Sequence, residues 1–281
     1  MSNFWTRTIT GLSMVFLLLF ALWFDRWLFA GFFLIISILG LWEFFSLFTT
    51  AHYRPQRIYG VITGTLLYLS VTWSTLCQLQ FEHLLWYFLP LYLGVVIFFL
   101  SFILEIYRKQ PHPMVNIAIT MTGVFYVAFP LAVLNVINGS ESVLFLGFPA
   151  YLLGYFLLTW VFDTGAYLYG KKFGKHKFFE RISPKKTWEG TIAGAIFSLL
   201  TAMGLFVLVK DIPLADWLVL AVIVLVFGSY GDLVESLFKR SLNIKDSGTI
   251  LPGHGGILDR FDTMLISAPF VFLYFILRNG I

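Results

Sequence analysis

The chain has 281 residues, of which 59% are apolar and 12% are charged, with a formal net charge of +4. A soluble globular protein carries roughly 25% charged residues, so a soluble enzyme, a disordered chain and a coiled coil are excluded. The apolar stretches are long and continuous, and they lack the alternation over ~10 residues that is typical of outer-membrane barrel strands. The composition therefore predicts an all-α, polytopic membrane protein.

A helix of roughly 20 apolar residues crosses the ~30 Å core of a bilayer, and the sequence predicts about nine such helices. Their approximate ranges are 9–24, 27–48, 58–77, 84–106, 114–137, 144–168, 190–209, 215–234 and 263–280. Arg7 precedes the first segment, as a basic residue precedes the apolar core of a signal peptide. No small-x-small cleavage pattern follows it, so we expect a retained helix.

The basic residues set the expected orientation. With nine helices and a cytoplasmic N-terminus, 16 of the 19 Lys and Arg residues lie on the cytoplasmic side. The opposite side holds only Arg26, Lys210 and Arg278. The positive-inside rule favours this topology. We expect one integral membrane domain over residues 1–281, in which 1–140 form hydrophobic helices and 141–281 carry charged cytoplasmic segments with the active site.

The first charged segment begins at Asp163, near the end of an apolar helix. A carboxylate there is either a functional acid that faces a cavity or a helix-end group that reaches water. Further on, Pro184 predicts a helix start, whose exposed amides together with Lys185 and Lys186 form an anion site. Alternatively, the lysines serve as topology signals near anionic lipid headgroups.

The second charged segment places Asp232, Glu235 and Lys239 on one helical face, and it sets Asp259 and Asp262 one helical turn apart. Carboxylate oxygens are ligands of Mg²⁺, which shares its remaining sites with water and substrate phosphates. The pattern predicts either a metal and polyphosphate site or a salt-bridged pair of helix ends.

Between Ser236 and Asp262 the sequence resembles the signature of the phosphatidate cytidylyltransferases, also called CDP-diacylglycerol synthases. The matching residues are Ser236, Lys239, Arg240, Lys245, Asp246, Pro252, His254, Gly255, Gly256, Asp259, Arg260 and Asp262. Residues 163–174 and 183–190 are also similar to the second half of that family.

This resemblance implies a Mg²⁺-dependent reaction in which CTP and phosphatidic acid give CDP-diacylglycerol and pyrophosphate, with a second cation left open. It implies a protein of the bacterial inner membrane, with its active site on the cytoplasmic side and no nucleic-acid partner. The metal ligands that it implies are Asp232 and Asp259, and the supporting catalytic acids are Asp163, Asp246 and Asp262. The residues implied to hold phosphates of CTP or lipid are Ser183, Lys185, Lys186, Lys239, Arg240, Lys245, His254 and Arg260; for His254, capping of the turn is the alternative.

Two other functions stay open: a CTP-dependent kinase of a polyprenol or another long-chain alcohol, and a secondary transporter with an acidic ion path. Glu43, in the middle of an apolar run, either touches the active cavity or is protonated and hydrogen-bonded to a neighbouring helix. The Gly60/Gly64 and Gly190/Gly194 pairs predict close helix packing and leave a homodimer open.

Overall fold

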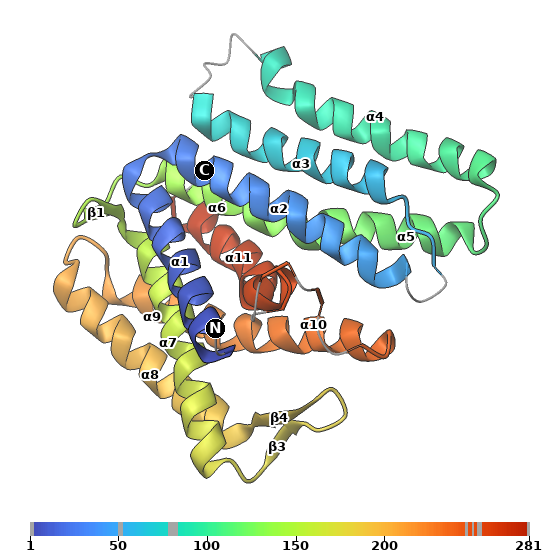
Figure 1. Ribbon diagram of the computed structural model, residues 1–281. Helices are drawn as coiled ribbons and strands as arrows, with labels where there is room; N and C mark the ends of the chain where they lie inside the picture. Colours follow the sequence, from blue (N-terminus) through green and yellow to red (C-terminus); the bar gives the residue numbers. More distant parts are fainter. Residues whose placement is uncertain are drawn as a thin grey trace. The chain divides into compact units, whose positions relative to one another are not determined.

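A computed structural model describes residues 3–49, 53–77, 84–244, 247–248, 250–251 and 255–279 (Figure 1). The helices are α1 (Asn3–Phe24), α2 (Arg26–Thr49), α3 (Arg57–Cys77), α4 (Leu84–Arg108), α5 (Pro113–Gly123), α6 (Phe129–Ser140), α7 (Ala150–Phe173), α8 (Trp188–Leu208), α9 (Leu214–Ile223), α10 (Ser229–Ser241) and α11 (Leu258–Asn279). Two π-helical turns join helices end to end, η2 (Val124–Ala128) between α5 and α6, and η3 (Val224–Gly228) between α9 and α10. The strands form two antiparallel hairpins, β1 (Leu144–Phe145) with β2 (Phe148–Pro149), and β3 (Lys177–Phe179) with β4 (Ser183–Thr187).

Five helical segments in the described residues are long and apolar enough to cross a membrane. They are α2, the continuous rod α5–η2–α6, α8, the rod α9–η3–α10, and α11. The predicted fold class, an all-α membrane protein, is therefore confirmed, with two short β-hairpins in addition to the helices. A helix is found in each of the nine predicted segments, but the crossing of a membrane by all nine stays a prediction.

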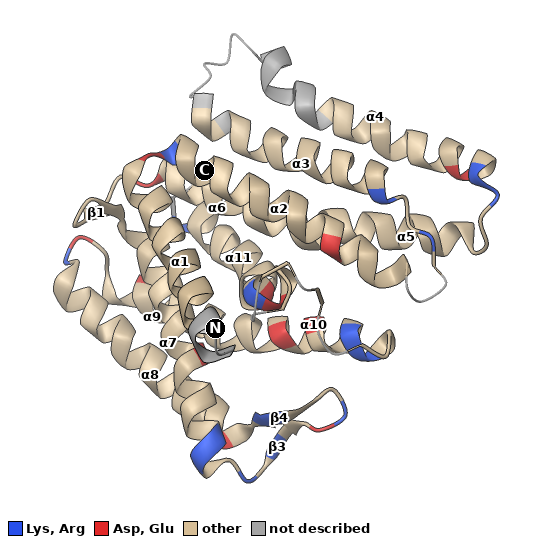
Figure 2. Cartoon of the chain, viewed as in Figure 1, with Lys and Arg blue, Asp and Glu red and all other residues tan. Residues whose placement is uncertain are grey.

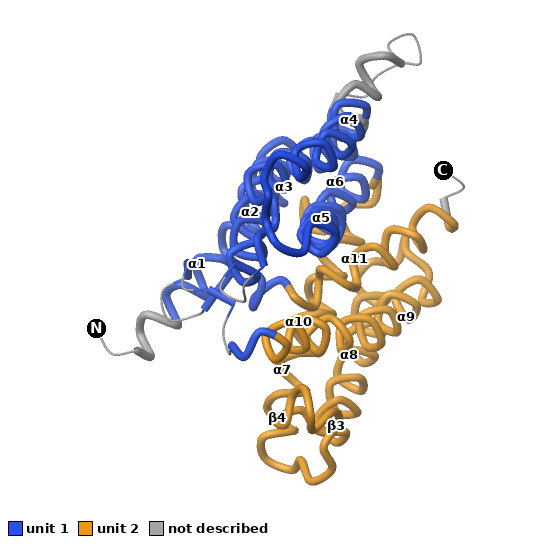
Figure 3. The backbone as a smooth tube through the Cα atoms, turned by 90° about the vertical axis from the view of Figure 1, so that its right-hand side faces the viewer, with its two compact units in different colours: residues 1–140, 242–261 blue, residues 141–241, 262–281 orange. Residues whose placement is uncertain are grey.

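The chain divides into two compact units (Figure 3). The first unit comprises Met1–Ser140 and Leu242–Phe261, and the second comprises Glu141–Ser241 and Asp262–Ile281. The chain leaves the first unit after α6, returns to it after α10, and leaves it again in the first turn of α11. The single membrane domain stays a prediction.

In the first unit, α3 packs closely on α2. A Cβ atom on Gly60 would lie 2.4 Å from the Phe45 ring, and one on Gly64 would lie 2.5 Å from Leu41. One polar contact joins the same helices, because the Tyr68 hydroxyl donates to the carbonyl of Ala30 at 2.7 Å. The predicted close packing at this glycine pair is confirmed, and its partner is a helix of the same chain.

In the second unit, the other glycine pair lets α8 approach α7. A Cβ atom on Gly190 would lie 2.6 Å from the carbonyl oxygen of Ala166, and one on Gly194 would lie 2.7 Å from that of Phe162. Contacts this close to backbone exclude any side chain larger than hydrogen. The homodimer that the two glycine pairs left open stays a prediction.

The start of the sixth predicted helix, at residue 144, was wrong. Residues 144–149 form the β1–β2 hairpin, in which Leu146 and Gly147 have positive φ values of 52° and 84°. Positive φ at both central residues is what a two-residue hairpin turn requires. Because residues 144–149 are in this hairpin, α7 begins only at Ala150. It ends at Phe173, five residues past the predicted end.

Candidate active site

The second unit brings acidic side chains from α10 and α11 together. Carboxylate oxygens of Asp232, Glu235 and Asp262 lie within 4.8 Å of one another, and we call these three residues the carboxylate cluster. Glu235 is buried, whereas Asp232 and Asp262 are half-buried. Carboxylates this close repel one another unless a cation or a proton lies among them, so the arrangement suits a divalent cation.

Lysine side chains stand beside the carboxylate cluster. Lys186, from strand β4, lies with its Nζ 2.8 Å from Asp232 Oδ2, and it also donates to the carbonyl of Ser229 at 3.3 Å. Lys239 forms an ion pair with Glu235 one helical turn earlier in α10. Each lysine therefore neutralises part of the acidic charge, and each carries N–H donors suited to a phosphate.

Asp163, from α7, belongs to the same group of charges. Thr263 Oγ1 lies 3.4 Å from both Asp163 Oδ2 and Asp262 Oδ1, so this hydroxyl lies between the two acids. Asp163 and Asp262 are close enough to repel each other, and Lys186 attracts both. In their ionised forms these four carboxylates face two ammonium groups, an excess of two negative charges that one Mg²⁺ would balance.

A glycine sets the spacing of the two helices that carry the cluster. A Cβ atom on Gly231 would lie 2.5 Å from the carbonyl oxygen of Asp262 and 3.0 Å from Thr263 Cα. The backbones of α10 and α11 therefore touch one residue before Asp232 and at Asp262. This contact brings carboxylates 30 residues apart in sequence within reach of a single ion.

Strand β4, which supplies Lys186, corrects an expectation. Residues Ser183–Thr187 were expected to open a helix at Pro184, and this was wrong, because they pair with β3. Proline disfavours the helical region for the residue before it, so Ser183 is extended. Helix α8 begins at Trp188, after Thr187, whose hydroxyl accepts from the amide of Gly190 and caps the helix.

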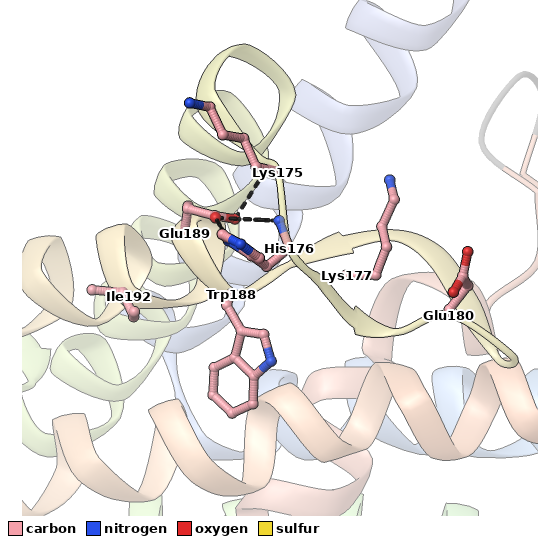
Figure 4. A pocket seen from close by; sticks show the side chains of 7 residues that line it. All are labelled: Lys175, His176, Lys177, Glu180, Trp188, Glu189 and Ile192. Atoms are coloured by element: carbon pink, nitrogen blue, oxygen red, sulfur yellow. Dashed lines mark hydrogen bonds and ion pairs between the residues drawn. The ribbon is translucent and has the colours of Figure 1, made fainter.

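The β3–β4 hairpin and the end of α7 form a basic region, as Figure 2 shows. Residues of this region and of α8 line a surface depression: Lys175, His176, Lys177, Glu180, Trp188, Glu189 and Ile192 (Figure 4). Glu189 accepts from the amides of Lys175 and His176 and contacts His176 Nδ1 at 2.6 Å. This carboxylate therefore connects the start of the hairpin to α8, and its oxygens already accept hydrogen bonds from Lys175 and His176.

The remaining predicted substrate-binding residues occupy different surroundings. Lys185 is exposed and Ser183 is half-buried on β4. Arg240 Nε donates to the carbonyl of Ile182 at 3.4 Å, which connects the end of α10 to the hairpin. Lys245, Asp246 and His254 lie outside the described residues.

Asp259 and Arg260 lie in the first unit, in the first turn of α11. Asp259 Oδ2 accepts from the amides of Ser247 at 3.1 Å and Gly256 at 2.9 Å, so this oxygen holds the segment that precedes the helix. The assignment of Asp259 as a metal ligand stays a prediction.

One member of the cluster was not among the predicted site residues. Glu235 lies three residues after Asp232, and the sequence placed both on one helical face, but Glu235 was not named among the metal ligands or the catalytic acids. The signal was present in the spacing, because residues three apart on a helix are neighbours. A charged residue buried in this way requires a partner, which here is Lys239.

Comparison with known proteins identifies the family of the chain. The model of the cytidylyltransferase family matches residues 5–277, so the chain belongs to that family, as the resemblance predicted. A Staphylococcus saprophyticus protein named phosphatidate cytidylyltransferase is 50% identical over 121 residues, which are 42% of this chain and 46% of that protein. Proteins of the same name from Staphylococcus aureus and Staphylococcus haemolyticus are 52% identical over the same shares. In these matches the chain spans about half the length of each relative.

Proposed function

We propose that the chain is a phosphatidate cytidylyltransferase that joins CTP and phosphatidic acid into CDP-diacylglycerol and releases pyrophosphate. The observation that carries this proposal is the carboxylate cluster with Lys186 beside it, in a chain of the cytidylyltransferase family. The name that the staphylococcal relatives bear supports the choice of lipid substrate.

The residues fit a magnesium ion. Asp232, Glu235 and Asp262 offer oxygen ligands within 4.8 Å of one another, and Asp163 adds a fourth carboxylate through its contact with Thr263. When bound, Mg²⁺ would neutralise the triphosphate and stabilise the pyrophosphate that leaves. Asp259, three residues before Asp262 in α11, stays in the proposal as a further ligand, and a second cation stays part of it.

In this reaction the protein mainly positions the two substrates and neutralises the charge of their phosphates. An oxygen of the phosphatidic acid phosphate forms a bond to the α-phosphorus of CTP, and the bond from that phosphorus to the bridging oxygen of the β-phosphate breaks. Lys186 and Lys239 supply N–H donors to the transferring phosphates, and Lys185, Arg240 and Arg260 are further donors in the proposal. Such electrostatic stabilisation is the largest part of catalysis in many phosphoryl-transfer enzymes.

The surroundings complete the proposal. Nine membrane crossings with a cytoplasmic N-terminus would place the β3–β4 hairpin and the end of α10 in the cytosol, where CTP is present. Phosphatidic acid would enter sideways from the inner membrane. The basic region of the hairpin supports this orientation, since basic residues favour the cytoplasmic side. We include a homodimer as an assembly to be tested.

Purified protein incubated with CTP labelled at the α-phosphate, phosphatidic acid and Mg²⁺ tests the proposal. We expect labelled CDP-diacylglycerol with stoichiometric pyrophosphate, and no product after chelation of the metal. Release of CDP with a phosphorylated alcohol would instead identify a lipid kinase. Cation-coupled uptake into liposomes without turnover would identify a transporter.

A further inference from the structure

Glu43 is a buried carboxylate in the last third of α2, a candidate membrane span, and the structure shows what surrounds it. The side chain is 3% exposed on α2 and lies in the first unit. Its Oε2 accepts from the amide of Ile257 at 2.8 Å, and its Oε1 accepts from the amide of Leu258 at 3.1 Å and from the Ser247 hydroxyl. Both oxygens are therefore occupied by donors from one segment, more than 200 residues away in the sequence.

These bonds make Glu43 the cap of α11. The carbonyl of Ile257 accepts from the amides of Arg260 and Phe261, so the helix starts there. The first amides of a helix have no partner within it, and Ile257 has no side-chain oxygen to accept them. A carboxylate from α2 takes that place, where the helix dipole also favours a negative charge.

Two glycines close around the carboxylate. A Cβ atom on Gly256 would lie 1.9 Å from Glu43 Oε1, and one on Gly248 would lie 2.7 Å from Oε2. Real Cβ atoms do not approach other atoms so closely, so any larger residue at either position would displace the Glu43 side chain or the backbone. The Glu43 side chain fills the space that a side chain would need at positions 248 and 256, which explains why both residues are glycine.

Asp259 also holds the same segment. Its Oδ2 accepts from the amides of Ser247 and Gly256, and Gly255 between them has a φ of +86°. Ser247 thus donates its hydroxyl to Glu43 and its amide to Asp259. Removal of the Glu43 bonds would release the backbone that fixes the Asp259 carboxylate.

We propose that Glu43 is a positioning residue, which caps α11 and holds Ser247 and Gly255–Leu258 so that Asp259 and Arg260 keep their working orientation. This inference rests on the cytidylyltransferase activity proposed above. Glu43 itself contacts neither substrate nor metal in this account and acts through the backbone of that segment.

The test compares Glu43→Gln and Ser247→Ala with Glu180→Gln, a control at an exposed hairpin residue. Glutamine keeps one oxygen that can accept a hydrogen bond. Its NH₂ group replaces the other oxygen and cannot accept from a backbone amide, so one of the bonds from Ile257 or Leu258 is lost. We expect hydrogen exchange of the Gly255–Leu258 amides to rise at least about tenfold in Glu43→Gln, because a local opening that loses its hydrogen bonds becomes more frequent. We expect kcat to fall and the Mg²⁺ concentration for half-maximal activity to rise by ~10-fold or more, the usual cost of losing a group that orients a ligand. Ser247→Ala should shift both quantities in the same direction by less, and Glu180→Gln should shift neither.

Unchanged exchange at Gly255–Leu258 in Glu43→Gln would overturn the proposal, even if kcat falls, because Glu43 would then not hold the segment. Rapid exchange with an unchanged kcat and Mg²⁺ requirement would also overturn it, since the cap would then be structural only. If the unmodified protein makes no CDP-diacylglycerol, the proposed function fails, while the exchange measurement still decides whether Glu43 holds the segment.

Discussion

Lys186 Nζ lies 2.8 Å from Asp232 Oδ2, which joins the β3–β4 hairpin to the carboxylate cluster by an ion pair. The lysine side chain is 25% exposed and that of the aspartate is 37% exposed, so the pair is open to an incoming substrate. An ion pair this open contributes little to stability, at most about 1 kcal/mol. The role in substrate binding proposed for Lys186 therefore does not require the pair to contribute much to folding.

Lys186→Met should separate these two roles. We expect kcat/KM for CTP to fall by ~100-fold, the usual loss when one charged donor to a transition state is removed. The midpoint of thermal unfolding in detergent should change little. Lys210→Met, at an exposed turn before α9, is the matched control and should keep full activity. Wild-type turnover in Lys186→Met would show that Lys186 does not bind the substrate.

Gly231→Ala tests the contact between α10 and α11. The new methyl group would lie 2.5 Å from the Asp262 carbonyl oxygen, so the helices must separate. We expect a loss of about 1–3 kcal/mol in the free energy of unfolding, as overpacked sites show. Gly204→Ala is the control, because nothing lies within 4 Å of its Cβ position in α8 and alanine favours a helix. If Gly231→Ala unfolds at the wild-type temperature, the close contact is not required.

The burial of Glu141 predicts that the free energy of unfolding depends on pH. Glu141 lies between α6 and α7, and burial raises its pKa to about 8, although the amide of Tyr151 donates to it. Between about pH 4.5 and pH 8 the folded protein keeps this proton while the unfolded chain loses it, so the free energy of unfolding falls as pH rises. Thermal unfolding of Glu141→Gln at several pH values should show a weaker fall than that of the unmodified protein. An identical slope for the two proteins would show that Glu141 is not responsible.

The helices were predictable because hydropathy reports membrane segments directly, and the spacing of Asp232 and Glu235 placed both on one face. The β1–β2 hairpin was missed because Leu144–Phe148 continues an apolar run that looks helical from composition. Strand β4 was missed because a proline fits both a helix start and an extended residue. The partners of Glu43 could not be deduced, since the segment that binds it lies more than 200 residues away and no local pattern reports such a contact.

The proposed cytidylyl transfer depends most directly on Asp262 as a ligand of the metal. The most direct measurement is a Mg²⁺ titration of CDP-diacylglycerol synthesis, with Mn²⁺ binding followed in parallel by electron paramagnetic resonance. We expect Asp262→Asn to weaken Mn²⁺ binding by ~10-fold or more and to lower turnover accordingly, because a ligand is lost. Asp211→Asn, at an exposed turn, should leave both quantities unchanged. Wild-type turnover and Mn²⁺ affinity in Asp262→Asn would contradict the account.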